Sequence, residues 1–146
     1  MQNVKQTYKL FLDDVRMPSE AYSYTGFKPF MTDDWIIVRN YDEFILKIKV
    51  AWEKYSFFPE LIAFDHDLAD EHYCPPAHWD NYSEWEKFQD FKEKNGFACA
   101  EWLTDFCIDN DLKLPEWFCH SMNPAGKDNI NFLLKNFKKH QDGTSN

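Results

Sequence analysis

Two apolar runs of this chain end abruptly in ionisable residues. Residues 8–16 read YKLFLDDVR, and residues 61–68 read LIAFDHDL. The acids that follow the two runs are Asp13, Asp14, Asp65 and Asp67. Carboxylates gathered in one cleft repel each other, so each raises its neighbour's pKa or requires a cation. One acid pair alone would favour ordinary turn residues, but two such clusters favour a functional site.

A hard divalent cation would relieve this repulsion. Mg²⁺ uses one or two protein carboxylates together with water and substrate phosphate, and Mn²⁺ also accepts carboxylate ligands. We therefore expect a Mg²⁺ or Mn²⁺ site formed by Asp13, Asp14 and Asp65 or Asp67. The alternative is that these acids only cap helices or turns.

Basic and polar residues near other run ends could bind a phosphorylated ligand. Arg16 and Arg39 present the guanidinium fork that suits phosphate, although either could instead pair with the nearby acids. Ser121 and Asn123 precede the last helical pattern, where they could hold a phosphate or simply cap the helix. We expect Arg16, Arg39 and Asn123 to contact the ligand.

Histidines accompany these groups. His66 lies between two of the acids, and His120 precedes Ser121. Imidazole titrates near neutral pH, so either ring could transfer protons during ester hydrolysis, with Asp65 or Asp67 as nucleophile or base. For His120 the alternative is a hydrogen-bonded core residue. The predicted catalytic residues are Asp65, His66, Asp67, His120 and Ser121.

Strand-like and helix-like patterns of apolar residues follow one another along the chain, and they predict the elements that position these residues. Short, almost continuously apolar runs predict strands covered on both faces, as in a parallel sheet, at residues 8–12, 35–39, 61–64 and 116–120. Helical spacing recurs in residues 41–55, 97–107 and 130–137. This order predicts an α/β fold with a mainly parallel sheet of four or five strands.

The carboxyl ends of parallel strands meet at one edge of a sheet, where ligands bind. The polar residues after each run should therefore converge on one crevice. Residues 17–34 lack clean helical periodicity, and residues 70–95 form a long aromatic segment with a short helix near residues 83–94. Long loops of this kind are often lids or binding loops. The stretch HWDNYSEWEKF could stack a base or cap the core, and we favour the cap.

Composition limits the function classes. A chain of 146 residues predicts one domain, assigned to residues 1–139, with a disordered tail at 140–146. The net charge of −9 opposes general nucleic-acid binding through phosphates. We see no signal pattern or membrane-spanning run, and the four cysteines form no C-x-x-C pair, so we expect a cytoplasmic protein with free thiols.

His72, Cys74 and His78 suggest a structural zinc site, but no fourth ligand is evident nearby, which makes the zinc interpretation weak.

The motifs LDDVR, FDHDL and HSMNPAG together resemble the cyclic-phosphate-processing receiver-like family, divergent relatives of response-regulator receivers met in bacteria and phages. The resemblance is collinear over residues 8–137, apart from variable loops at 19–33 and 70–94. It implies a receiver-like (flavodoxin-like) three-layer sandwich with long loop insertions. It also implies that Asp13 and Asp14 match the acid pair that holds Mg²⁺, Asp65 the phosphate-accepting position, and Ser121 the hydroxyl position.

The resemblance and the residues together predict a metal-dependent phosphoesterase acting on cyclic phosphates of nucleotides or RNA ends. The alternative is a non-enzymatic module that binds Mg²⁺ and a phosphorylated ligand or accepts a phosphoryl group. No fifth strand ending in the lysine of true receivers is evident, which weighs against phosphorelay signalling. A dehalogenase-like D-x-D reading of Asp65 and Asp67 is weaker still, because such enzymes place this motif on their first strand.

Overall fold

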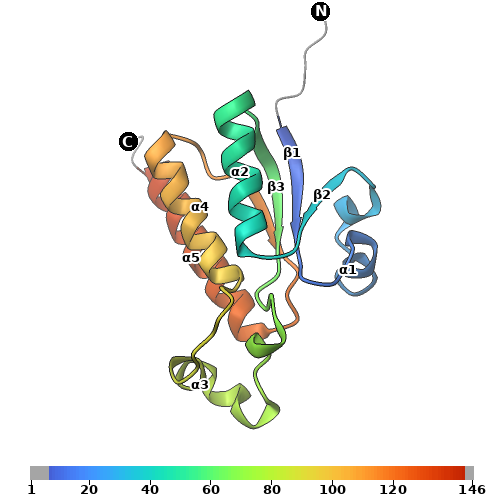
Figure 1. Ribbon diagram of the computed structural model, residues 1–146, viewed down its shortest axis with the longest axis vertical. Coiled ribbons are helices and arrows are strands. Elements are labelled where there is room, and N and C mark those ends of the chain that lie inside the picture. The colour runs from blue at the N-terminus through green and yellow to red at the C-terminus, as the bar shows by residue number, and fades with distance from the viewer. Residues whose placement is uncertain (1–6, 144–146) are drawn as a thin grey trace, which may run out of the picture.

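The computed structural model describes residues 7–143, which form a parallel sheet covered by helices on both faces (Figure 1). The strand order is β2-β1-β3-β4, and every neighbouring pair is parallel. The strands are β1 (Thr7–Leu12), β2 (Trp35–Val38), β3 (Phe58–Phe64) and β4 (Glu116–Cys119). The helices are α1 (Pro18–Thr25), α2 (Tyr41–Tyr55), α3 (Tyr82–Lys87), α4 (Gly96–Asn110) and α5 (Pro124–Gly143). The predicted α/β class and parallel sheet are confirmed, with four strands in residues 7–143.

Alternate residues of the central strands enter two separate cores. Leu10, Leu12, Ile62 and Phe64 pack in one cluster with buried residues of α2, α4 and α5. Phe11 and Ala63 lie in a second cluster with residues of α1 and of the 3₁₀ turn that follows it. Because successive side chains of a strand point to opposite faces, a continuously apolar strand is buried on both sides. Figure 1 shows α1 on one side of the sheet and α2, α4 and α5 on the other.

The strands end level with one another. In the strand register, Leu12 aligns with Val38 on one side and with Phe64 on the other. Phe64 in turn aligns with Cys119, the last residue of β4. All four strands therefore end in one row, and the residues that follow them leave the sheet at the same edge.

The backbone ladder continues for one residue beyond this row. The N–H groups of Asp13, Asp65 and His120 each donate to the carbonyl that ends a neighbouring strand, at 3.1, 3.0 and 3.0 Å. These three residues are thus held by strand hydrogen bonds rather than by flexible loops. Their side chains start from fixed backbone positions.

Asparagine side chains cap the N-termini of three helices. Two of these helices follow strands, and the third follows the long insertion at residues 69–95. The Oδ1 atoms of Asn40, Asn95 and Asn123 accept backbone N–H groups from the first turns of α2, α4 and α5, at 2.9, 3.1 and 3.0 Å. Such N-caps satisfy donors that a helix start otherwise leaves unpaired. The short loops at the site edge therefore turn directly into helices.

The interpretation of residues 17–34 as a loop is wrong in part, because α1 and a 3₁₀ turn at Lys28–Met31 lie there. α1 begins with Pro18, and the Glu20 carboxylate accepts the Met17 N–H at 3.0 Å. Gly26 ends the helix with φ of 67°. Only Pro18 and Ala21 of this helix are buried, so it carries too few apolar residues to show periodicity.

Other boundaries also differ from the prediction. α5 extends to Gly143, so residues 140–143 are helical rather than a disordered tail, and residues 144–146 lie outside the described residues. In the insertion, α3 ends at Lys87 rather than near residue 94. β3 begins at Phe58, three residues before the predicted start, and includes Pro59.

Gly96 closes the insertion against the strand end that carries Asp65. Its N–H donates to the carbonyl of His66 at 2.7 Å, and a Cβ at position 96 would clash with the backbone carbonyl of Asp65. We predict that Gly96→Ala lowers the free energy of unfolding by roughly 1–3 kcal/mol, because overpacking forces the backbone to move. Gly143→Ala, where no atom of residues 7–143 apart from the chain neighbours and the helix backbone lies within 4 Å of the added Cβ, is the matched control. Urea unfolding of both variants tests this, and equal stability of the two would contradict it.

Candidate metal and phosphate site

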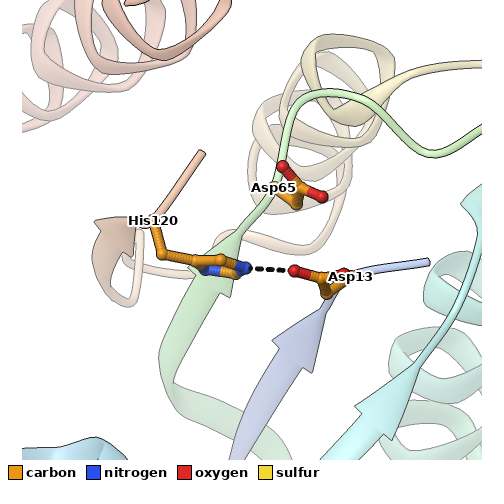
Figure 2. A group of neighbouring side chains, drawn as sticks. All are labelled: Asp13, Asp65 and His120. Carbon is orange, nitrogen blue, oxygen red and sulfur yellow. Dashed lines mark hydrogen bonds and ion pairs between the residues drawn. The ribbon is translucent and has the colours of Figure 1, made fainter. Parts of the chain in front are cut away.

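Asp13, Asp65 and His120 come together at the level edge of the sheet (Figure 2). Each offers a ligand atom, and these atoms lie within 4.8 Å of one another. The three residues are almost wholly buried, at 0%, 3% and 1% exposure. Two carboxylates and an imidazole at this spacing form a donor set that could hold a divalent cation.

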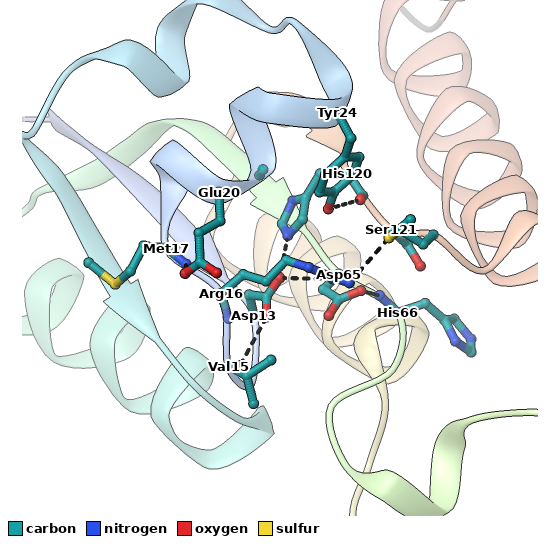
Figure 3. Close-up of polar contacts among 12 residues, drawn as sticks. Asp13, Val15, Arg16, Met17, Glu20, Tyr24, Asp65, His66, His120 and Ser121 are labelled. Atoms are coloured by element: carbon teal, nitrogen blue, oxygen red, sulfur yellow. Dashed lines mark hydrogen bonds and ion pairs between the residues drawn. The ribbon is translucent and has the colours of Figure 1, made fainter.

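Asp13 is the most heavily bonded of the three (Figure 3). Its Oδ1 accepts the backbone N–H groups of Val15 and Arg16 at 2.9 and 2.8 Å. Its Oδ2 lies 3.0 Å from His120 Nε2 and 3.7 Å from an Arg16 guanidinium nitrogen. Burial alone would raise the pKa of Asp13, but the hydrogen bonds from His120, Arg16 and Val15 lower it on balance. Asp13 is therefore a carboxylate at neutral pH.

His120 lies in an aromatic pocket on the α1 side of the sheet. Its ring stacks on Phe11 at 4.6 Å between centroids and meets the edge of Phe30 at 5.7 Å. Burial lowers its pKa on balance, although Asp13 opposes the shift, so the ring is neutral at pH 7. A neutral ring donates to Asp13 only through a protonated Nε2. In this state His120 holds the Asp13 carboxylate in place.

Asp65 carries the clearest sign of a missing partner. Its Oδ1 accepts the backbone N–H of His66 at 2.9 Å, but its Oδ2 is buried without a hydrogen-bond partner in residues 7–143. Burial, followed by the charges of Asp13, Asp67 and Asp14, raises the pKa of Asp65 to about 8. A bound cation would satisfy the unpaired oxygen and favour the carboxylate. The residues present thus fit a divalent cation.

Asp14 stands apart from this group of three. Asp14 is partly buried. It does not belong to the group of residues whose ligand atoms lie within 4.8 Å of one another, which consists of Asp13, Asp65 and His120. Its Oδ1 nevertheless is buried without a hydrogen-bond partner among the described residues, and burial and Asp13 raise its pKa. Asp14 as a metal ligand therefore stays a prediction.

His66 and Asp67 form a second buried pair. His66 Nδ1 lies 2.7 Å from Asp67 Oδ1, which also accepts the side-chain N–H of Asn123 at 3.2 Å. His66 is 1% exposed, and its ring lies flush against Gly126, where a Cβ would clash with it. The imidazole thus contacts Asp67, which lines the cleft, and does not line the cleft itself.

A cleft of about 320 Å³ opens beside these acids. Its polar lining comes from Arg16, Asp65, Asp67, Ser121 and Asn123. Its other lining residues are Tyr73, Cys74, Trp79, Tyr82, Met122, Pro124 and Ala125. The Ser121 hydroxyl oxygen accepts the Asn123 backbone N–H at 3.1 Å, which leaves the hydroxyl hydrogen free to donate. Acids, a guanidinium and a hydroxyl thus face one small-molecule-sized space.

Residues 8–136 match the family described as the Cyclic-phosphate processing Receiver domain. The chain belongs to this family. Comparison with curated proteins and with solved structures found no match. None of the helices in residues 7–143 combines the length and apolar character needed to cross a membrane.

In this receiver domain, several predicted site residues do not line the cleft. Arg39 donates to the backbone carbonyls of Asp13 and Arg16 at 3.0 and 2.7 Å, so it braces the loop after β1. The rings of His66 and His120 also lie outside the cleft lining. Ligand contact by Arg39 and proton transfer to substrate by either histidine stay predictions, whereas the observed contacts favour positioning roles.

The zinc interpretation of His72 is wrong for this receiver domain. Its Nδ1 accepts the Leu68 N–H at 2.9 Å, and its Nε2 lies 2.6 Å from the Glu93 carbonyl oxygen. Both ring nitrogens thus connect the insertion to the sheet edge.

Sequence reasoning also missed Tyr24 of α1, whose hydroxyl donates to the His120 carbonyl at 2.8 Å. No apolar pattern pointed to α1, so nothing drew attention to Tyr24.

The raised pKa of Asp65 predicts how pH changes stability without metal. The unfolded carboxyl deprotonates near its ordinary pKa of 3.8, whereas the folded one keeps its proton to about pH 8. Stability from this group is therefore full below the unfolded pKa and is lost as pH rises through about 8. Asp65→Asn cannot titrate, so in chelator it should gain roughly 1–3 kcal/mol over wild type at pH 8 and less at pH 5.

Thermal unfolding in chelator at the two pH values measures this difference. Asp105→Asn, which replaces an exposed acid on α4, is the control and should show no pH-dependent gain. Added Mg²⁺ or Mn²⁺ should then raise the melting temperature of wild type but not of Asp65→Asn. An Asp65→Asn variant that is less stable than wild type at pH 8 would contradict this account of the site.

Proposed function

We propose that this receiver domain is a metal-dependent phosphoesterase that hydrolyses cyclic phosphates of nucleotides or RNA ends. The observation that carries the proposal is the unpaired, buried Oδ2 of Asp65 beside a cleft that Arg16 and Ser121 also line. An acidic group that needs a cation thus lies next to groups that suit a phosphate. The family's description as cyclic-phosphate processing supports the substrate class.

Asp13 and Asp65 would hold Mg²⁺ or Mn²⁺, with His120 either joining them as a ligand or keeping Asp13 in position. A divalent cation in such a site polarises a phosphate and lowers the pKa of water. Asp14 is the further candidate ligand. The donor set contains an imidazole, so Mn²⁺ suits it better if His120 is a ligand, whereas Mg²⁺ suits the carboxylates alone.

Arg16 is the only Lys or Arg side chain that lines the cleft in the described part of the chain. One of its guanidinium nitrogens lies 3.7 Å from Asp13 and another 3.2 Å from the Met122 sulfur, so donors remain for a phosphate oxygen. The Ser121 hydroxyl can donate a second hydrogen bond. The Arg16 charge and the Ser121 hydrogen bond would both stabilise negative charge on the phosphate as the ring opens.

Asp67 is the residue we assign as the base. It faces the cleft, and its contacts with His66 and Asn123 fix its orientation. Water attacks phosphorus, one bond from phosphorus to a ring oxygen breaks, and Asp67 takes one proton of the water. Asp67 then gives this proton to the leaving ring oxygen, which becomes a hydroxyl, while the second water proton stays on the phosphate. Asp67 thus ends as a carboxylate and the product is a phosphate monoester.

A phosphoacceptor module is the second candidate function, because Asp65 and the Ser121 hydroxyl line the same cleft. The cleft lining contains no lysine in residues 7–143, whereas true receivers use one to couple phosphorylation to switching. This difference favours hydrolysis over signalling. Incubation with acetyl phosphate and Mg²⁺ followed by mass spectrometry distinguishes the two, since only an acceptor retains a stable phosphoryl group on Asp65.

The direct test is turnover of 2′,3′-cyclic nucleotides, 3′,5′-cyclic nucleotides and cyclic dinucleotides with Mg²⁺ or Mn²⁺, followed by chromatography. We expect one class to be hydrolysed and the activity to vanish with chelator. Asp65→Asn should reduce kcat at least about 100-fold, the loss typical when a group that stabilises the transition state is removed. Asp105→Asn should keep wild-type activity.

Retained turnover in Asp65→Asn would remove that residue from the mechanism. Turnover that persists in chelator would exclude a metal-dependent reaction. If no substrate is hydrolysed although calorimetry shows that Mg²⁺ or Mn²⁺ binds, the phosphoacceptor or ligand-binding module becomes the better description.

A further inference from the structure

The insertion, residues 69–95, contains two groups of aromatic residues in addition to the exposed Phe88. Tyr82, Trp85, Phe91 and His72 pack against one another, with ring centroids 5.0–5.9 Å apart along the chain of contacts. Tyr82 also meets the ring of His66 at 5.9 Å. These residues form one aromatic cluster next to His66. Of the stretch at residues 78–88, for which we favoured a core cap, only Tyr82 and Trp85 belong to this cluster.

Tyr73 and Trp79 behave differently. Neither ring makes a ring–ring or cation–π contact within residues 7–143, and both line the cleft. Trp79 is 67% exposed and Tyr73 47% exposed. Large aromatic side chains at the mouth of a cleft, without a packing partner of their own kind, offer open faces to a ligand.

Hydrogen bonds within the insertion orient the Trp79 ring and join the two ends of the segment that carries both rings. Trp79 Nε1 donates to the Cys74 carbonyl at 2.9 Å, which sets the orientation of the indole. At the base of the insertion, the Glu71 carboxylate accepts the backbone N–H groups of Lys92 and Glu93 at 2.9 and 2.7 Å. Together with the two hydrogen bonds of His72, these contacts join its outgoing and returning segments. A surface that is ordered in advance loses less freedom when a ligand binds.

The cleft therefore combines two kinds of lining from two parts of the chain. The strand ends and adjoining loops supply the acids, Arg16 and Ser121, whereas the insertion supplies the open aromatic faces of Tyr73 and Trp79. A phosphate suits the first part and a flat, apolar ring suits the second. A nucleotide carries both groups in one molecule, and its base has a π-face whatever its identity.

We propose that Trp79 and Tyr73 form a base-stacking subsite, so that the ligand of this cleft is a nucleotide rather than a base-free cyclic phosphate. This inference rests on the proposed function for its phosphate end and adds the part of the ligand that the insertion recognises. The volume of about 320 Å³ lies at the lower end of small-molecule sites and suits a single nucleotide unit. A lining with one guanidinium and no lysine in the described chain likewise suits one phosphate rather than a polynucleotide backbone.

Equilibrium binding tests the subsite independently of catalysis. Calorimetry with Mg²⁺ would compare adenosine 3′-monophosphate with 1-deoxyribose 3-phosphate, which lacks the base. We expect wild type to bind the nucleotide more tightly. Trp79→Ala combined with Tyr73→Ala should weaken nucleotide binding roughly 10- to 100-fold, the effect of losing base–aromatic stacking, and leave the base-free ligand unchanged.

Two further variants separate stacking from loss of structure. Trp79→Phe keeps an aromatic face without the Nε1–H donor and should retain most of the nucleotide affinity. Phe88→Ala removes an aromatic residue of the same insertion that is 82% exposed but does not line the cleft, and it should bind both ligands like wild type. Equal weakening of both ligands in the double variant would mean that the insertion had moved, and would overturn the stacking role.

The same panel distinguishes failure of the subsite from failure of the proposed function. If the double variant hydrolyses cyclic nucleotides like wild type and binds the nucleotide equally well, the subsite is wrong while the phosphoesterase stands. If nucleotide binding depends on Trp79 but wild type hydrolyses no cyclic phosphate, the subsite stands while the phosphoesterase is wrong. No preference of wild type for the nucleotide over the base-free ligand would also overturn the subsite.

Discussion

The site depends on the common register in which the four parallel strands end. Because the last residues of the strands align, the residues one position further on are brought together by backbone hydrogen bonds before any side chain interacts. The carboxyl groups of Asp13 and Asp65 are then buried close together, which makes it costly for both to be ionised and raises the pKa of Asp65. Hydrogen bonds to Asp13 offset part of this cost, and the unpaired oxygen of Asp65 shows the part that remains.

Sequence patterns predicted the strands and the residues after them well. Continuous apolar runs indicate burial on both faces, and the rule that parallel strands share a carboxyl edge then places Asp13 and Asp65 in one site. Helical spacing of apolar residues likewise predicted α2 and the part of α5 at residues 130–137. The early start of β3 was not, because Pro59 and Glu60 interrupt its apolar run, although the strand continues through them.

What the sequence did not show depends on side-chain direction and on short segments. The sequence pattern did not predict that the His120 ring would pack against Phe11 and Phe30 and contact Asp13. It also did not predict that the His66 ring would lie outside the cleft lining. The sequence also did not show that the Arg39 guanidinium donates to the backbone carbonyls of Asp13 and Arg16, because such acceptors have no sequence signature. α1 is held by its caps and two buried residues, too few for a periodic signal.

The hydrogen bond from Gly96 to the His66 carbonyl joins two points of the chain on either side of the insertion. The insertion still touches the acidic edge, because Tyr82 packs against the His66 ring and His72 accepts the Leu68 N–H. Loop-closure entropy grows only slowly with loop length, so a change of length between residues that make no such contact would cost little. On the proposed function, the strand ends would supply the reaction chemistry and Trp79 and Tyr73 the ligand choice, so substitutions at these two positions would change which ligand binds more than how it reacts.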